Sequence, residues 1–197
     1  MTEKPLILID PDPRNRAMIL SDDAWAELNR IARVVAWFEG GRMPRAMVEE
    51  HLPETSIIIG QTHLDAADIA RAPKLRAVVN VKGNWEPTLD YAACQAAVIH
   101  VLSIAPAMAQ AVAEWCLGAA IDLGRGLTRA DADFRAGTER YGIRGNADAV
   151  TLYGATVALI GYGNLGRALR PLLAPFGCEI LVHDPWLPAG WLAEQGA

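Results

Sequence analysis

The sequence predicts an α/β fold built on parallel β-sheets. Short, almost wholly apolar runs alternate with segments of helical periodicity, as expected when helices cover both faces of a parallel sheet. Apolar residues make up 52% of the 197 residues and charged residues 21%, a balance that supports a packed core and argues against disorder. A chain of this length accommodates one large or two small domains.

The first hundred residues alternate five strand-like runs with four helix-like segments, which we interpret as a flavodoxin-like unit with one parallel sheet. Ser21 is a suitable helix N-cap, and Gly60 stops a strand. Ligands of such sheets bind beyond the carboxyl ends of the strands, which here are followed by residues 10–12, 60–63 and, above all, 80–86. The predicted strands are 6–9, 34–38, 56–59, 76–81 and 98–102, and the predicted helices are 21–31, 44–52, 65–72 and 88–97.

The second half opens with a long helix, predicted over 107–123. Its apolar residues lie most of the way around the helix, so we expect it to be buried between layers. A helix over 128–136 ends at Gly137, and residues 138–152 show no period and are interpreted as an extended arm. A last helix is predicted over 188–195.

The most informative stretch runs from residue 156 to residue 185. A strand-like run (156–160) leads into a glycine-rich turn, a helix-like segment (167–176) and a second strand-like run (179–183) that ends on Asp184. A GxGxxG turn between a strand and a helix, with an acid at the tip of the next strand, is the dinucleotide-binding fingerprint. Its six positions here are Gly161, Tyr162, Gly163, Asn164, Leu165 and Gly166.

Each part of this fingerprint has a mechanical reason. Gly161 permits a tight turn, Gly163 lets the backbone approach a pyrophosphate, and Gly166 lets helix and strand pack closely. The helix N-terminus offers free N–H groups and partial positive charge to the phosphates. Asp184 would accept hydrogen bonds from the adenosine ribose and repel a 2′-phosphate, which favours NAD over NADP. The alternative is a βαβ unit whose glycine-rich turn binds no ligand.

Together with four upstream segments, this stretch resembles the D-2-hydroxyacid dehydrogenase family. The matching residues lie at 75–84, 89–94, 98–102 and 111–114 and over the whole of 152–188, in the order found in the family. The resemblance implies an NAD-dependent oxidoreductase that transfers a hydride between the nicotinamide and C2 of a 2-hydroxy acid or 2-keto acid, with the cofactor carrying the hydride chemistry.

The resemblance also implies two domains around a cleft that closes about residues 102–106. Residues 1–104 would form the flavodoxin-like substrate domain, and residues 105–197 the N-terminal part of a Rossmann NAD-binding domain. In this family the loop after the fourth strand offers backbone N–H groups to the substrate carboxylate, and here that loop is Val81-Lys82-Gly83-Asn84. Independently of the resemblance, a glycine loop beyond a strand end forms an anion-binding concavity. The alternative is that this loop is a plain turn before a helix.

Two side chains at this loop are open to more than one interpretation. Lys82 is unusual for the family's loop and would add a charge-assisted contact to an anionic substrate, unless it is simply a solvated lysine. Trp85 either forms a wall of the cleft or packs the loop onto the core.

The resemblance extends to the surroundings of the cofactor. It places His183 and Pro185, on either side of Asp184, among the cofactor-binding residues, and the long helix near the nicotinamide. Glu114 within that helix is interpreted as structural rather than catalytic. Members of the family are often dimers joined through the cofactor domain, so a homodimer is expected.

No catalytic residue is assigned within the chain. The family uses an arginine, a histidine and an acid that follow the second strand of the nucleotide domain, and His51, His63, His100 and His183 stand at no suggestive spacing to an acid. We therefore expect a C-terminally truncated representative, inactive on its own, with exposed apolar faces that favour association. The alternatives are a non-enzymatic NAD-binding regulatory module and an inactive fragment.

Charge, cysteine usage and hydropathy limit the partners and the cellular location that we expect for the protein. With 18 basic and 23 acidic residues, the net charge of −5 argues against non-specific nucleic-acid binding. Cys94, Cys116 and Cys178 contain no CxxC pair and indicate reduced thiols, with no metal site expected. The apolar run at 6–9 does not resemble a signal peptide, and residues 98–123 are too interrupted to span a bilayer. We expect a cytoplasmic protein with a small-molecule substrate and no membrane or nucleic-acid partner.

Overall fold

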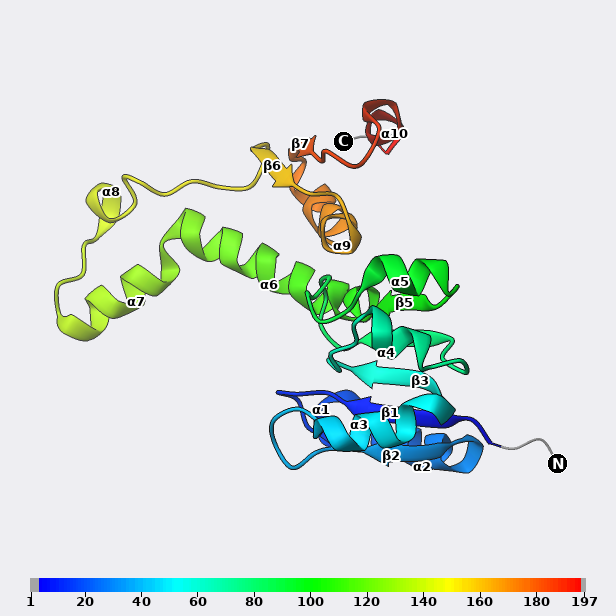
Figure 1. The fold of residues 1–197 in the computed structure, drawn as a ribbon. Coiled ribbons are helices and arrows are strands. Elements are labelled where there is room, and N and C mark those ends of the chain that lie inside the picture. The colour runs from blue at the N-terminus through cyan, green and yellow to red at the C-terminus, as the bar shows by residue number, and fades with distance from the viewer. Residues whose placement is uncertain (1–3, 196–197) are drawn as a thin grey trace. The chain divides into compact units, whose positions relative to one another are not determined.

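The computed structural model describes residues 4–195, which form two compact units that divide between Ile104 and Ala105 (Figure 1). The first unit contains one sheet in which every neighbouring pair of strands is parallel. Its strand order is β2-β1-β3-β4-β5, which is the flavodoxin-like order and confirms the predicted class. The strands are β1 (Leu6–Asp10), β2 (Arg33–Ala36), β3 (Thr55–Gly60), β4 (Ala77–Asn80) and β5 (His100–Ser103).

Apart from α3, which follows Pro44, the α-helices of the first unit begin at side-chain caps that the sequence provides. Ser21 accepts a hydrogen bond from the backbone N–H of Ala24, and Asp65 forms a capping box with Asp68. One short helix that the sequence did not predict begins after Asn15, whose side chain accepts from Met18 N. The helices are α1 (Arg16–Ile19), α2 (Asp22–Ile31), α3 (Arg45–His51), the 3₁₀ turn η1 (Leu52–Glu54), α4 (Ala66–Ala70) and α5 (Tyr91–Ala96).

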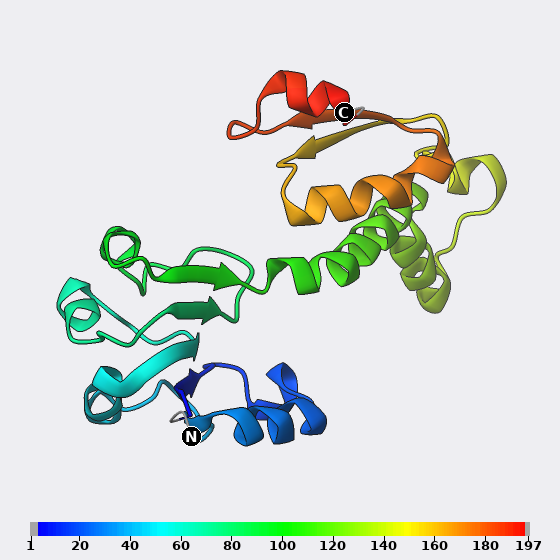
Figure 2. The same ribbon diagram turned by 90° about the vertical axis from the view of Figure 1, so that its right-hand side faces the viewer.

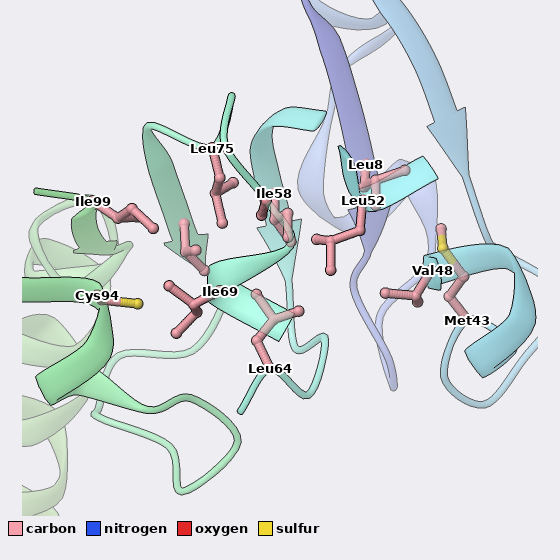
Figure 3. Close-up of a cluster of buried hydrophobic side chains, with 12 residues drawn as sticks. Leu8, Met43, Val48, Leu52, Ile58, Leu64, Ile69, Leu75, Cys94 and Ile99 are labelled. Carbon is pink, nitrogen blue, oxygen red and sulfur yellow. The ribbon is translucent and has the colours of Figure 1, made fainter. Parts of the chain in front are cut away.

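Helices cover both faces of this sheet, which explains why β1 is buried along its whole length. Successive side chains of a strand point to opposite faces. Leu8 packs on one face in a cluster with Ile58 and with side chains of α3, α4 and α5 (Figure 3). Ile7 and Ile9 pack on the other face with side chains of α2.

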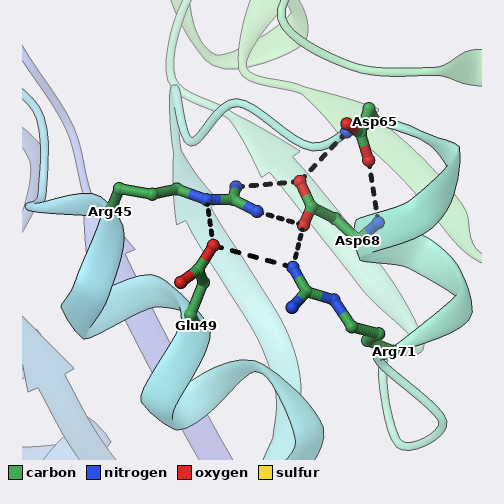
Figure 4. A network of polar contacts seen from close by, with 5 residues as sticks. All are labelled: Arg45, Glu49, Asp65, Asp68 and Arg71. Atoms are coloured by element: carbon green, nitrogen blue, oxygen red, sulfur yellow. Dashed lines mark hydrogen bonds and ion pairs between the residues drawn. The ribbon is translucent and has the colours of Figure 1, made fainter.

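A polar network ties α3 to α4 (Figure 4). The Asp68 carboxylate, 1% exposed, accepts hydrogen bonds from Arg45 Nη1 at 2.8 Å and from Arg71 Nη2 at 2.7 Å. Arg45 also donates to Glu49 at 2.8 Å. These contacts, led by the hydrogen bonds from Arg45, hold the pKa of the Asp68 carboxyl well below its usual range.

The strand predicted from residue 98 begins only at His100. Val98 lies in the left-handed region with φ 58°, and its N–H donates to Gln95 O. Ile99 N donates to Cys94 O, so the chain completes the C-terminal turn of α5 before it extends. A helix stop without glycine or asparagine gave no signal in the sequence.

The second unit contains a parallel pair of strands, β6 (Thr156–Ile160) and β7 (Glu179–His183), joined by α9 (Asn164–Leu173) and the 3₁₀ turn η2 (Ala174–Phe176). Helix α6 packs against α9 (Figure 2). A small core gathers around Leu159, Tyr162 and Leu192. The other helices of this unit are α6 (Ala105–Arg125), α7 (Leu127–Ala136), α8 (Gly142–Gly145) and α10 (Ala189–Glu194).

The expectation that the long helix is buried between layers is wrong for the part of the chain that the structure describes. The buried side chains of α6 form a single stripe of small residues, Ala105, Ala109 and Ala113. Trp115 of the same helix is 73% exposed, and Leu123 is 82% exposed. The stripe arises because alanines four residues apart share one face of the helix, whereas the apolar side chains around it are half-buried or exposed.

The arm predicted over residues 138–152 is irregular except for α8. It returns to the end of α6, where Val150 N donates to Gly124 O at 2.8 Å. Within residues 4–195, none of the helices combines the length and hydropathy that a bilayer span requires.

Candidate functional site

The glycine-rich turn joins the end of β6 to the start of α9. Gly161 has φ +91°, a conformation that favours glycine, and its N–H donates to His183 O at 2.8 Å. The turn is therefore fastened to the end of the neighbouring strand β7.

Gly163 is the N-cap residue of α9, which begins at Asn164 and not at the predicted residue 167. A Cβ atom at Gly163 would have no protein atom within 4 Å, so open space lies beside this residue. Within residues 4–195, no protein acceptor is found for the N–H groups of Gly163, Asn164 and Leu165. Free N–H groups at a helix N-terminus, together with the partial positive charge there, make a binding site for an anion.

Gly166 lies in the first turn of α9, close to the preceding loop. A Cβ atom here would be 2.7 Å from Gly161 O and 3.4 Å from Tyr162 Cδ2. Only glycine lets the helix start this close to the end of the strand.

Tyr162 has a structural place in the turn. Its side chain is 4% exposed and packs edge-on against Trp191, with ring centroids 6.3 Å apart. Its N–H donates to Asp184 Oδ2 at 2.7 Å, and its carbonyl accepts from Arg167 Nε at 3.1 Å. Tyr162 therefore anchors the turn to the small core of the second unit.

Asp184 follows β7 directly and is half-buried. Its Oδ2 accepts from Tyr162 N, and its Oδ1 accepts from Trp186 N at 2.9 Å. These backbone N–H groups, Tyr162 first, lower the pKa of the carboxyl, so the group is ionised near neutral pH. A carboxylate has about four lone-pair positions, so Asp184 retains acceptor capacity for a ligand. The side chains of His183 and Pro185 on either side are exposed.

The second predicted site is the loop of residues 81–84 in the first unit. Val81 is buried, whereas Gly83 and Asn84 are exposed. Asn80 holds the loop at two points, because Lys82 N donates to its Oδ1 and its Nδ2 donates to Asn84 O, both at 2.8 Å. The N–H groups of Gly83 and Asn84 donate to no acceptor in the described part of the chain, as an anion site on the backbone requires.

Lys82 and Trp85, the two side chains with more than one interpretation, each contact another side chain. Lys82 Nζ lies 3.3 Å from Glu86 Oε2, so its charge already has a partner. Trp85 is 66% exposed and meets the edge of Tyr91 at a centroid distance of 5.3 Å. Trp85 is therefore not part of the core, and its indole is mostly accessible.

The histidine side chains of residues 4–195 are mostly exposed. His63, His100 and His183 are exposed, His51 is half-buried, and none of the four is hydrogen-bonded to a carboxylate there. Glu114 is exposed on α6 and so does not need a buried partner.

Residues 117–196 match the family model of the D-isomer specific 2-hydroxyacid dehydrogenase, NAD binding domain. Among curated proteins, a D-3-phosphoglycerate dehydrogenase of Mycobacterium leprae is 25% identical over 162 residues, which cover 82% of this chain and 30% of that protein. An (S)-sulfolactate dehydrogenase of Chromohalobacter salexigens is 31% identical over 140 residues, covering 71% of this chain and 44% of that protein.

Among solved structures, a phosphoglycerate oxidoreductase from Rhizobium etli superimposes with a TM-score of 0.78 at 37% sequence identity. The superposition covers 98% of this chain and 59% of that one. The chain therefore spans between 30% and 59% of the length of these relatives.

Proposed function

Because this chain belongs to the family of D-isomer specific 2-hydroxyacid dehydrogenases and carries its NAD binding domain, we propose that the protein is an NAD-dependent oxidoreductase. It acts on the CH–OH group of a 2-hydroxy acid and, in reverse, reduces a 2-keto acid. When bound, the nicotinamide supplies or accepts the hydride.

The start of α9 carries the cofactor proposal. The free N–H groups of Gly163, Asn164 and Leu165 bind the pyrophosphate, with the open space beside Gly163 left for it. Gly161 and Gly166 permit the geometry of the turn, Asp184 accepts hydrogen bonds from the adenosine ribose, and His183 and Pro185 flank it.

The loop of residues 81–84 binds the substrate carboxylate. This proposal is supported by the unpaired N–H groups of Gly83 and Asn84 beyond the end of β4. Within residues 4–195 we assign no catalytic acid or base. The first unit is thus proposed as the substrate domain and the second as the cofactor domain.

The assembly and location expected from the sequence are proposals of the same kind. The exposed apolar side chains of α6 and the arm, such as Trp115 and Ile143, are consistent with a homodimer joined through the second unit. A light-scattering mass of the purified protein tests this, because a monomeric mass contradicts it. Fractionation of the source cells tests the proposed cytoplasmic location.

Turnover tests the enzymatic proposal. The intact polypeptide that carries this sequence is assayed by NADH absorbance with glyoxylate, pyruvate, hydroxypyruvate and the 2-keto acids that correspond to D-3-phosphoglycerate and (S)-sulfolactate. We expect NADH oxidation with at least one of them. Saturable NADH binding without turnover on any of them would favour the second candidate, a non-enzymatic NAD-binding module, which is consistent with the lack of a histidine–carboxylate pair in residues 4–195.

A further inference from the structure

Two buried amide side chains lie at the carboxyl ends of β3 and β4, next to the proposed substrate loop. Gln61 follows β3 and Asn80 ends β4, and they are 2% and 7% exposed. Gln61 Nε2 donates to Asn80 Oδ1 at 2.6 Å. The side chains thus join the carboxyl ends of two neighbouring parallel strands.

Both polar atoms of the Asn80 side chain and its backbone carbonyl are hydrogen-bonded. Its Oδ1 accepts from Lys82 N as well as from Gln61, and its Nδ2 donates to Asn84 O. Its backbone carbonyl accepts from Ile104 N at 3.2 Å. The side chain therefore holds the loop on both sides of Gly83, at Lys82 N and at Asn84 O.

Gln61 is held only in part. Its backbone N–H donates to Asp10 O at 2.7 Å, but its Oε1 is buried without a hydrogen-bond partner among the described residues. Burying an unpaired oxygen costs free energy that a leucine of similar size would avoid. The contribution that only the amide makes here is its hydrogen bond to Asn80.

We propose that Gln61 and Asn80 are positioning residues that hold residues 82–84 in the conformation that leaves the N–H groups of Gly83 and Asn84 free for the substrate carboxylate. The proposal rests on the function proposed above for this loop. Gln61 orients Asn80, and Asn80 orients the backbone. Neither side chain needs to touch the substrate.

Kinetics of the intact polypeptide test this with three variants. Asn80→Ala and Gln61→Leu should raise the KM for the 2-keto acid about tenfold or more, because a misplaced carboxylate site binds poorly, and should leave the KM for NADH within about twofold. Thr55→Val is the matched control. Thr55 is fully buried at the opposite end of β3, and its Oγ1 donates to His51 O at 2.8 Å, so the variant loses one buried hydrogen bond remote from the loop. It should leave both KM values unchanged.

Gln61→Glu gives a signature that a merely structural role would lack. A protonated glutamic acid can donate to Asn80 Oδ1, whereas the carboxylate repels it, and burial raises the pKa of such a group. The KM for the 2-keto acid should therefore approach the wild-type value as pH falls and rise above it as pH increases through that pKa. Gln61→Leu should keep a high KM at every pH.

Hydrogen exchange tests the positioning role independently of the proposed enzymatic function. In both Asn80→Ala and Gln61→Leu, the peptide covering residues 81–86 should exchange at least about fivefold faster. Asn80→Ala removes the acceptor of Lys82 N, and Gln61→Leu removes the hydrogen bond that keeps this acceptor in place. Faster exchange in a protein without turnover supports the positioning role and rejects only the enzymatic one. Unchanged exchange overturns the positioning role, as do keto-acid KM values within twofold of wild type in an active enzyme.

Discussion

Two glycines of the turn before α9 should respond to the same substitution in opposite ways. At Gly163 an added Cβ meets no protein atom within 4 Å, whereas at Gly166 it would lie 2.7 Å from Gly161 O. Gly163→Ala should therefore fold normally and lose NAD affinity, because the methyl group occupies the space left for the pyrophosphate. Gly166→Ala should destabilise the second unit itself.

The expected magnitudes follow from these contacts. At Gly166 an overpacked contact with backbone costs about 1–3 kcal/mol, partly offset by a gain of about 1 kcal/mol in helix propensity. Because Gly161 O belongs to the backbone and cannot move aside cheaply, the cost lies near the upper end of this range. The net loss of about 2 kcal/mol lowers the melting temperature by several degrees. At Gly163 the loss of a glycine N-cap costs about 0.5 kcal/mol, while NAD affinity falls at least about tenfold, or 1.4 kcal/mol.

The assay combines calorimetric titration of NADH with thermal unfolding of the same samples without cofactor. Gly118→Ala is the control, because Gly118 lies inside α6 and an added Cβ there also meets nothing within 4 Å. It should be at least as stable as wild type and bind NADH unchanged. The reasoning fails if Gly163→Ala keeps its NADH affinity, or if Gly166→Ala melts with the wild-type protein.

Three further substitutions test separate contacts. Asp184→Ala should weaken NAD binding and relax selectivity against NADP, measured by titration with both cofactors; unchanged selectivity removes Asp184 from the ribose site. Asp68→Asn should flatten the acid side of the stability profile in urea unfolding at a series of pH values. The folded pKa of Asp68 is lowered chiefly by Arg45, so its contribution is complete above the unfolded pKa of about 3.9 and is lost as pH falls below it; an unchanged slope contradicts this. Val98→Asn should raise the free energy of unfolding by about 1 kcal/mol, because Val98 is 79% exposed and strained at positive φ, where asparagine is tolerated; destabilisation would refute this.

The sequence was a good guide where local chemistry decides the structure. The strands of the first unit are nearly continuous apolar runs. Ser21 marks a helix start by the hydrogen bond that its hydroxyl accepts, and Gly137 marks a helix end by its left-handed backbone. The start of α9 was placed late, because Asn164 and Gly166 are weak helix formers that the turn geometry nevertheless places in the first helical turn. The exposure of α6 depends on what packs against it, and periodicity carries no such information.

In the candidate site, too, local features could be predicted from the sequence and long-range contacts could not. The fingerprint spacing predicted the open N-terminus of α9, because a short segment builds it. The pairing of Gln61 with Asn80 could not be predicted, because residues 19 positions apart meet only through the strand register. The hydrogen bond from Tyr162 N to Asp184, 22 positions away, likewise depends on how the turn folds back.

Transfer of deuterium tests the central claim most directly. The intact polypeptide is incubated with a 2-keto acid and NADH that carries deuterium at the transferred position of C4, and the product is analysed by mass spectrometry and chiral chromatography. The account predicts a 2-hydroxy acid of a single configuration with one deuterium at C2. Formation of an unlabelled 2-hydroxy acid, or labelled cofactor that remains unconsumed with every 2-keto acid tested, would contradict it.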